Sequence, residues 1–121
     1  MDALTGIIIG MHIASVHSVG GMNNTNLGIY IRAQSGFSAG TYRNSYRRDT
    51  YYAGWTWESE SKTWALSTVA ASGYRNHLVG VPLLSARLPI TDALAARVGY
   101  IPKPPGVGGS HVGHLMLEWR L

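Results

Sequence analysis

The feature that most constrains the fold is a period-two alternation of apolar with polar residues, which recurs along the chain. It is clearest between Thr41 and Trp57, where two alternating runs flank a polar turn, Arg47-Arg48-Asp49. Such a pair of runs predicts a β-hairpin, because successive residues of a strand point to opposite faces of the sheet. In the second run one face carries Tyr51, Ala53, Trp55 and Trp57, and the other carries Tyr52, Gly54, Thr56 and Glu58.

Eight strand-like segments can be distinguished, separated by turn-forming residues. We expect them over Gly6–Ser18, Asn26–Ala33, Phe37–Ser45, Thr50–Glu58, Thr63–Tyr74, Val79–Pro89, Leu94–Pro102 and His111–Leu121. Their regular spacing predicts a single all-β domain, residues 1–121, and the even number of strands is compatible with an eight-stranded antiparallel up-and-down β-barrel. The apolar N-terminal run has no basic residue before it, so we interpret it as the first strand and not as a signal peptide.

The alternation leaves open which sheet face lies inside the barrel. In a soluble barrel the apolar faces point inward and Arg32, Arg97 and Glu118 point to water; in a lipid barrel the apolar faces point outward and these charges pair inside. Charged residues make up only 13% of the chain, about half the usual share, which favours the lipid orientation. The lack of an export signal argues against it. No stretch is apolar for long enough to form a spanning helix, so a membrane location requires a barrel.

Two prolines interrupt one of the expected strands. Pro82 and Pro89 cannot donate to a β-ladder, so the strand that contains them cannot be fully paired on both sides. The region Val81–Ile90 is therefore expected to be an irregular or open part of the sheet. An opening in a barrel wall would admit a hydrophobic ligand from the side; a simple bulge is the alternative.

Most motifs of cofactor and metal chemistry are absent from the sequence. Without cysteine there is neither a disulfide framework nor thiolate chemistry. The histidine spacings do not place two ligands on one face of a strand, and no zinc or nucleotide motif occurs, so neither a metal nor another cofactor is expected. Arg47 and Arg48 lie among tyrosines, a combination that can grip single-stranded nucleic acid. Two arginines are too few for this, and we expect no nucleic-acid partner.

A hydrolase-type site needs a serine, a histidine and an acid that hold one another. Ser45 and His12 are available near strand ends, and the nearest acids, Asp49 and Asp92, lie in expected turns. No G-x-S-x-G motif surrounds Ser45. Spacing alone therefore gives only weak support for nucleophilic catalysis.

Several short segments, taken in order, resemble the PagP-type lipid A palmitoyltransferases, which are small eight-stranded outer-membrane barrels. The similar segments are Met11-His12-Ile13-Ala14, Asn26-Leu27-Gly28-Ile29-Tyr30, Tyr42-Arg43-Asn44-Ser45-Tyr46, residues 52–59, the proline-interrupted residues 81–89, Gly99-Tyr100-Ile101-Pro102 and residues 115–121. The family transfers a palmitoyl chain from a phospholipid to lipid A with a His, an Asp and a Ser. The resemblance implies that His12, Asn44 and Ser45 occupy these catalytic positions. The chain is also similar in outline to short barrels from bacteriophage genomes.

The sequence departs from the family at the acid. Asn44 stands where the family has an aspartate, so no carboxylate is available to orient His12. In triads the loss of this carboxylate lowers the rate by orders of magnitude. The family's amphipathic N-terminal helix is also missing, and the last residue, Leu121, is not aromatic. The resemblance thus implies a scaffold that is kept while acyltransferase activity is weak or lost.

Three hypotheses on function follow from these observations. The first is a PagP-like barrel that binds an acyl chain or another amphipathic ligand, in the outer membrane if an export segment has been removed. The second is a non-catalytic barrel, phage-encoded and cytoplasmic or virion-associated, that binds a protein or an anionic ligand through its rim. The third is a structural subunit whose Trp and Leu stripes are buried in a homo-oligomer. The expected ligand contacts are Arg43, Arg47, Arg48, Tyr52, Pro82 and Pro89.

Overall fold

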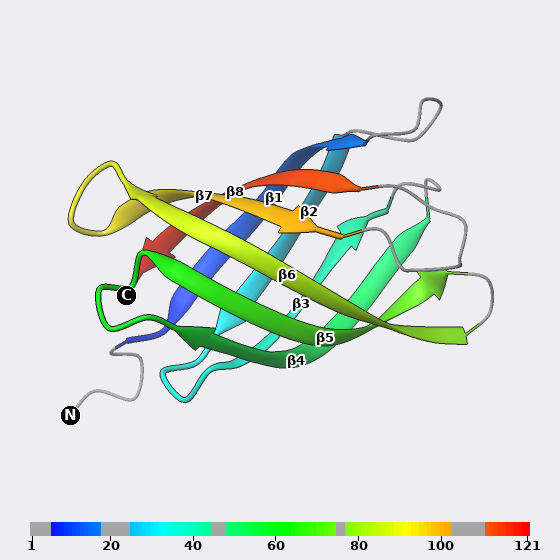
Figure 1. Ribbon diagram of the computed structural model, residues 1–121, viewed down its shortest axis with the longest axis horizontal. Helices are drawn as coiled ribbons and strands as arrows, with labels where there is room; N and C mark the ends of the chain where they lie inside the picture. The colour runs from blue at the N-terminus through cyan, green and yellow to red at the C-terminus, as the bar shows by residue number, and fades with distance from the viewer. Residues whose placement is uncertain (1–5, 18–24, 45–47, 75–76, 103–110) are drawn as a thin grey trace.

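The computed structural model describes residues 6–17, 25–44, 48–74, 77–102 and 111–121, and these residues form strands and their connections. The strands are β1 (Ile8–His17), β2 (Thr25–Arg32), β3 (Phe37–Arg43), β4 (Asp49–Glu58), β5 (Trp64–Tyr74), β6 (His77–Pro89), β7 (Leu94–Ile101) and β8 (Val112–Arg120). Each strand pairs antiparallel with the next, and β8 pairs with β1, so the sheet closes into an up-and-down barrel (Figure 1).

The barrel confirms the predicted fold class. The bounds of all eight strands lie within two residues of the expected ones. This agreement follows from the side-chain period of two, which marks both the extent of a strand and the residues that share a face. Closure also pairs every strand with a neighbour on each side over at least part of its length. Among the described residues no helix is long and apolar enough to cross a membrane.

The connections divide the barrel into two ends. Three connections lie at the end of the barrel where β1 begins and β8 finishes (Figure 1). They are residues 33–36 between β2 and β3, residues 59–63 between β4 and β5, and residues 90–93 between β6 and β7. We call this the turn end. At the opposite end β1, β3, β5 and β7 finish and β2, β4, β6 and β8 begin, and we call it the loop end.

Large apolar side chains point outward from the barrel wall. Leu27 and Ile29 of β2, for example, are 60% and 62% exposed. The same outward face carries Ile9, Met11, Ile31, Phe37, Trp55, Trp57, Trp64, Leu66, Leu84, Leu88, Val98 and Leu115. Within the described strands its only charged residues are Arg43 and Asp49, both at the loop end. The band between the two ends is therefore apolar and uncharged over the strands that the structure describes.

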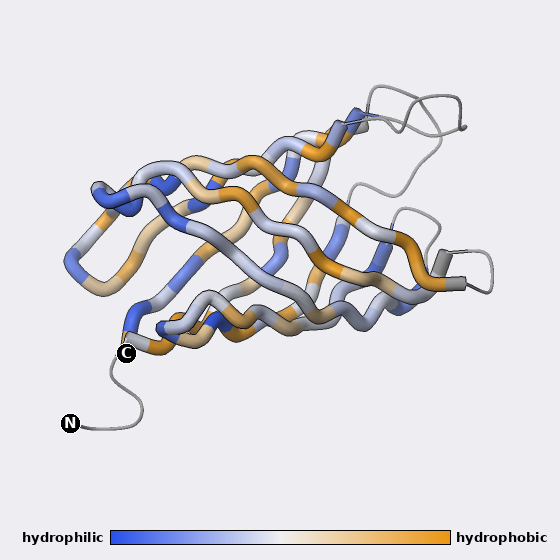
Figure 2. Tube along the Cα trace, turned by 60° about the horizontal axis from the view of Figure 1, so that its bottom comes forward, coloured by the Kyte–Doolittle hydropathy of each residue, from blue (hydrophilic) through white to orange (hydrophobic). Residues whose placement is uncertain are grey.

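Polar and charged side chains point inward. The buried residues include His12, Ser15, Asn26, Arg32, Ser38, Thr50, Thr56, Ser85, Arg97 and Glu118. Hydrophilic and hydrophobic positions alternate along the strands in Figure 2 as this arrangement requires. Of the two orientations that the alternation permits, the chain adopts the one with its apolar face outside.

Glycines make room for tyrosine rings in this narrow interior. A Cβ atom at Gly10 would lie only 2.0 Å from the ring of Tyr30, and one at Gly40 would lie 2.7 Å from the hydroxyl of Tyr52. A side chain at either position would displace these rings. The glycines thus fix the tyrosines inside the barrel, where their hydroxyls meet the polar groups described below.

Candidate ligand-binding cavity in the barrel interior

A cavity of about 120 Å³ lies inside the barrel. One of its walls is polar and comes mostly from β1 to β4 and β8, with His12, Ser15, Asn26, Tyr42, Tyr52 and His114. The facing wall is apolar and comes from β5 to β8, with Val69, Val81, Leu83, Ile101 and Val112. The cavity is therefore amphipathic, a character that suits a ligand with an apolar chain and polar atoms.

His12 lies at the centre of the polar wall. Its Nε2 atom is 2.7 Å from the hydroxyl of Tyr52, and its Nδ1 atom is 2.8 Å from Nε2 of His114. The ring also contacts the rings of Tyr30 and Tyr42, with centroids 4.8 and 5.1 Å away. His12 is only 6% exposed. Both of its nitrogens thus have hydrogen-bond partners, and its ring is held in one orientation.

A β-bulge in β1 places Ser15 on the same face as His12. The register of β1 shifts between His12 and Ala14, so that His12 pairs with Met116 while Ser15 pairs with His114. The bulge inserts one residue and resets the alternation. His12 and Ser15, three residues apart, are consequently both buried in the interior. The His12–His114 contact joins β1 to β8 and exists only because the barrel closes.

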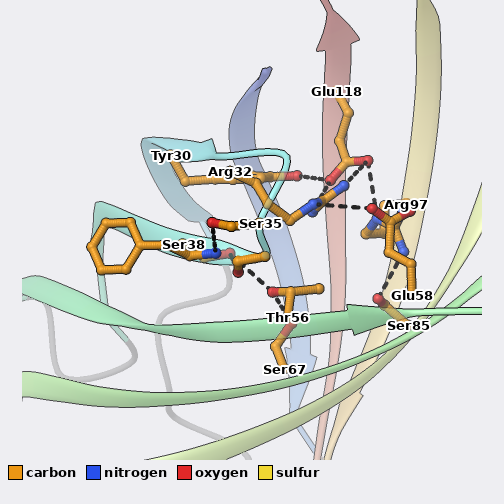
Figure 3. A network of polar contacts seen from close by, with 12 residues as sticks. Tyr30, Arg32, Ser35, Ser38, Thr56, Glu58, Ser67, Ser85, Arg97 and Glu118 are labelled. Atoms are coloured by element: carbon orange, nitrogen blue, oxygen red, sulfur yellow. Dashed lines mark hydrogen bonds and ion pairs between the residues drawn. The ribbon is translucent and has the colours of Figure 1, made fainter. Parts of the chain in front are cut away.

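An ionic network fills the interior toward the turn end (Figure 3). Glu118 accepts two hydrogen bonds from Arg32, from Nη1 at 3.0 Å and from Nη2 at 3.3 Å, and a third from the hydroxyl of Tyr30 at 2.6 Å. The Nε atom of Arg97 lies 3.0 Å from the same carboxylate. Glu58 pairs with Arg32 at 3.6 Å, and Arg97 donates to Ser85 at 3.0 Å. Arg32, Arg97 and Glu118 of this network also line the cavity.

Four atoms of the network have no hydrogen-bond partner in the described structure. They are Nε of Arg32, Nε and Nη2 of Arg97, and Oε2 of Glu58; the two Nε atoms still lie in ion pairs with Glu58 and Glu118. A buried donor without an acceptor costs about 1–3 kcal/mol, and more when the group is charged. Arg97 is 2% exposed and lines the cavity. Its Nη2 atom therefore keeps hydrogen-bonding capacity that no described residue uses.

Asn44, one of the expected catalytic residues, is fully buried and hydrogen-bonds to residues near the loop-end termini of β4 and β5. Its Nδ2 atom donates to Oγ1 of Thr50 and to the carbonyl of Gly73, both at 3.0 Å. Its Oδ1 atom accepts from the backbone N–H of Arg48 at 3.1 Å. In the described structure His12 bonds to Tyr52 and His114 and not to Asn44. The structure therefore does not bring His12 and Asn44 together as a catalytic pair, and Ser45 lies outside the described residues.

The structure places only some of the expected rim contacts at the rim of the barrel. Arg43 and Arg48 are exposed at the loop end, and Arg43 pairs with Asp49 at 3.3 Å. Tyr52 does not lie on the rim but inside the barrel, beside His12. Arg47 lies outside the described residues. Of the residues that join Tyr52 at the cavity, sequence reasoning singled out His12 but not Tyr30, Tyr42 or His114, because each lies on a different strand.

The backbone nitrogens of Pro82 and Pro89 face sides of β6 that have no paired strand residue at those positions among the described residues. The N–H of Arg87 bonds to Thr63, on the β5 side, and the N–H of Ile90 bonds to Leu94, on the β7 side. Because N–H groups alternate along a strand, the nitrogen of Pro89 faces the β5 side and that of Pro82 faces the β7 side. Pairing with β5 ends at Ala86, and pairing with β7 begins only at Leu84.

The prediction of an irregular segment over Val81–Ile90 is therefore wrong for its greater part. Residues 84–89 pair regularly with β7, and residues 79–86 pair regularly with β5. The opening in the described structure is shorter and lies nearer the loop end. There residues 79–83 have no described strand partner on the β7 side. Val81 and Leu83, which line the cavity, belong to this edge.

Comparisons of the chain with protein-family models, with curated proteins and with solved structures found no match.

Proposed function

We propose that the protein is a membrane-embedded barrel, of the outer-membrane type, that binds an acyl chain or a similar amphipathic ligand in its interior. The observation that carries this proposal is the polarity of the wall, apolar outside and polar inside. Soluble monomers rarely expose apolar patches larger than a few hundred Å². Full burial of one Leu or Ile side chain is worth about 1.5–3 kcal/mol, so a whole band of such residues strongly favours lipid over water.

Aromatic residues on the outer surface support a membrane location. Phe37, Trp55, Trp57 and Trp64 lie near the turn end, and Tyr51 and Tyr100 lie near the loop end. Membrane barrels carry such girdles where the lipid meets water, because these rings are part apolar and part polar. The turn-end connections of four or five residues also match the short turns typical of one side of these barrels.

The amphipathic cavity supports the binding of an acyl chain. The apolar wall offers contacts to methylene groups, and the polar wall offers donors and acceptors to an ester or a head group. Residues 79–83 of β6, which have no β7 partner among the described residues, lie beside the cavity, and we propose them as the lateral path from lipid. Pro82 keeps this path free of a backbone donor.

Acyltransferase activity is proposed to be weak or lost. Asn44 lacks a carboxylate and spends both amide hydrogens on Thr50 and Gly73. His12 is oriented by Tyr52 and His114, neither of which is an acid that would stabilise an imidazolium. We expect the purified barrel, mixed with a phospholipid that carries a labelled palmitoyl chain and with lipid A, to transfer no label above background. Transfer at an enzymatic rate would contradict this part of the proposal.

Binding of a protein or an anionic ligand at the rim is a second candidate. Arg48 is exposed at the loop end, and the exposed Arg43–Asp49 pair beside it is one that solvent weakens. Replacement of Arg43 and Arg48 by alanine would weaken such a rim complex while leaving acyl-chain binding in the interior unchanged.

Membrane extraction tests the main proposal. Membranes from cells that express the full chain are washed with alkaline carbonate, which releases peripheral proteins, and the pellet and supernatant are compared. We expect the chain to stay in the pellet, to need detergent for release, and then to retain palmitate or a lysophospholipid by native mass spectrometry. Recovery of a monodisperse monomer without detergent would overturn the membrane proposal. Release in detergent with no retained ligand would overturn the binding proposal alone.

A further inference from the structure

The interior of the barrel carries more positive than negative charge. Arg87 pairs across β6 and β7 with Arg97, and Arg120 pairs across β8 and β1 with the buried Ile8. Directly opposed residues share a face, so both arginines belong to the interior face. That face of the described strands thus carries Arg32, Arg87, Arg97 and Arg120 against Glu58 and Glu118.

The arginines that make up this surplus of positive charge, Arg87 and Arg120, lie on β6 and β8. Glu118 and Glu58 are already engaged by Arg32 and Arg97. Neither Arg87 nor Arg120 forms an ion pair with any residue in the described part of the chain. Like charges directly opposite each other on neighbouring strands repel, as Arg87 and Arg97 do here. An anion held near this pair would remove the repulsion.

Arg97 connects this surplus to the cavity. Its guanidinium is almost completely buried, it lines the cavity, and its Nη2 atom has no hydrogen-bond partner among the described residues. Nη1 and Nε are committed to Ser85 and Glu118. Nη2 of Arg97 is thus a charged donor at the cavity wall that a bound anion can engage.

We propose that the ligand of this cavity is an anionic single-chain amphiphile, whose carboxylate accepts hydrogen bonds from Nη2 of Arg97 while its chain lies along the apolar wall. The carboxylate would sit above the ionic network, and Val81, Leu83 and Ile101 would cover the chain. This inference rests on the proposed function, since it specifies the head group of the acyl-chain ligand. A hydrogen bond between two charged groups is stronger than one between neutral groups, so the carboxylate should also set the specificity.

The test compares two ligands that share a chain and differ in the head. The full-length barrel in a nonionic detergent is incubated at pH 8 with equal concentrations of palmitate and hexadecanol, and bound molecules are counted by native mass spectrometry. We expect palmitate to be preferred about tenfold, the effect of one charge-assisted hydrogen bond. Equal retention of both ligands overturns the anionic head while leaving acyl-chain binding intact. Retention of neither overturns the proposed function itself.

Two variants locate the head group, and a third controls for charge. Arg97→Gln should abolish the preference for palmitate while hexadecanol binds as before. Arg87→Gln removes a charge that has no ion-pair partner in the described structure, so it should fold even if Arg97→Gln does not, and it should reduce the preference by a few fold. Lys62→Gln removes a positive charge from an exposed turn and should leave the preference unchanged. An unchanged preference in Arg87→Gln together with a drop in Lys62→Gln would overturn the inference.

Discussion

The two halves of the barrel interior are built differently. The turn-end half is filled by a network of arginine and glutamate side chains in which Glu118 has three partners. The loop-end half contains a cavity, a cluster of histidine and tyrosine side chains around His12, and an apolar wall. One half is closed by strong, directional contacts, whereas the other keeps space for a guest.

Because of this difference, we expect the turn-end half to contribute stability and the loop-end half to bind the ligand. Buried charges are costly unless they are paired, so a half that depends on them loses much when one partner is removed. A half that contains a cavity gains little stability from its wall residues but can bind a ligand there. Substitutions in the turn-end half should therefore change the free energy of unfolding, and substitutions in the loop-end half should change binding.

The largest effect is expected at Glu118. Glu118→Gln removes the negative charge that Arg32 and Arg97 share, and leaves both guanidinium groups buried without their main counterion. Breaking a buried ion pair in this way costs about 3–5 kcal/mol. The measurement is urea unfolding of the barrel refolded in lipid vesicles, followed by tryptophan fluorescence. Glu60→Gln, an exposed residue of the β4–β5 turn, is the matched control and should change the free energy of unfolding by less than about 0.5 kcal/mol. Similar values for the two variants would contradict a structural role for the network.

Asn44→Asp should come next in magnitude, and it separates a structural from a catalytic role. Aspartate restores the acid of the palmitoyltransferase pattern, but it cannot donate to Thr50 or to the carbonyl of Gly73. Leaving these bonds unmade with a buried charge costs about 2–3 kcal/mol. We expect a destabilised barrel with no gain in palmitoyl transfer. A gain of transfer activity at unchanged stability would show that the residue belongs to a catalytic site.

Glu118 and Asn44 also show which features of the structure could be predicted from the sequence. The alternation was sufficient for the strands, because a period of two defines both a strand and its faces. It could not decide which face lies inside, since both orientations satisfy the same pattern, and only the closed structure shows the polar face within. Glu118 and Arg32 are 86 residues apart and meet only through closure of β8 onto β1.

The candidate site was harder to predict from the sequence, because its residues also meet only in the closed barrel. Tyr52 and His12 were both singled out in the sequence, yet as a rim contact and as half of a catalytic pair. Their direct bond runs from β1 to β4 across the interior of the closed barrel, which a spacing rule does not contain. Asn44 was placed by resemblance alone, and its buried bonds could not be read from the sequence.

A change in the cavity wall should affect binding more than stability. Val81→Phe extends an apolar side chain into the cavity, where space exists, so the free energy of unfolding should change by less than about 1.5 kcal/mol. The ring would occupy volume that the acyl chain needs, and palmitate affinity should fall about tenfold, or about 1.4 kcal/mol. Val98→Phe makes the same change on the outer surface, where Val98 is 47% exposed, and should leave affinity unchanged. Equal losses in both variants would show that the chain binds on the outside of the barrel.

The smallest effect is expected at Tyr52, within the cluster around His12. Tyr52→Phe removes the hydroxyl that bonds to Nε2 of His12 and leaves that nitrogen without a partner in the described structure. A lost neutral hydrogen bond with one buried group unsatisfied costs about 1 kcal/mol, well below the loss expected when Glu118 is neutralised. Urea unfolding in vesicles measures it, and Tyr51→Phe, the outward-facing neighbour, should stay within about 0.5 kcal/mol of the wild-type protein. A loss at Tyr52 as large as that at Glu118 would mean that the loop-end half is as tightly coupled as the turn-end half, and that its cavity is not free to admit a ligand.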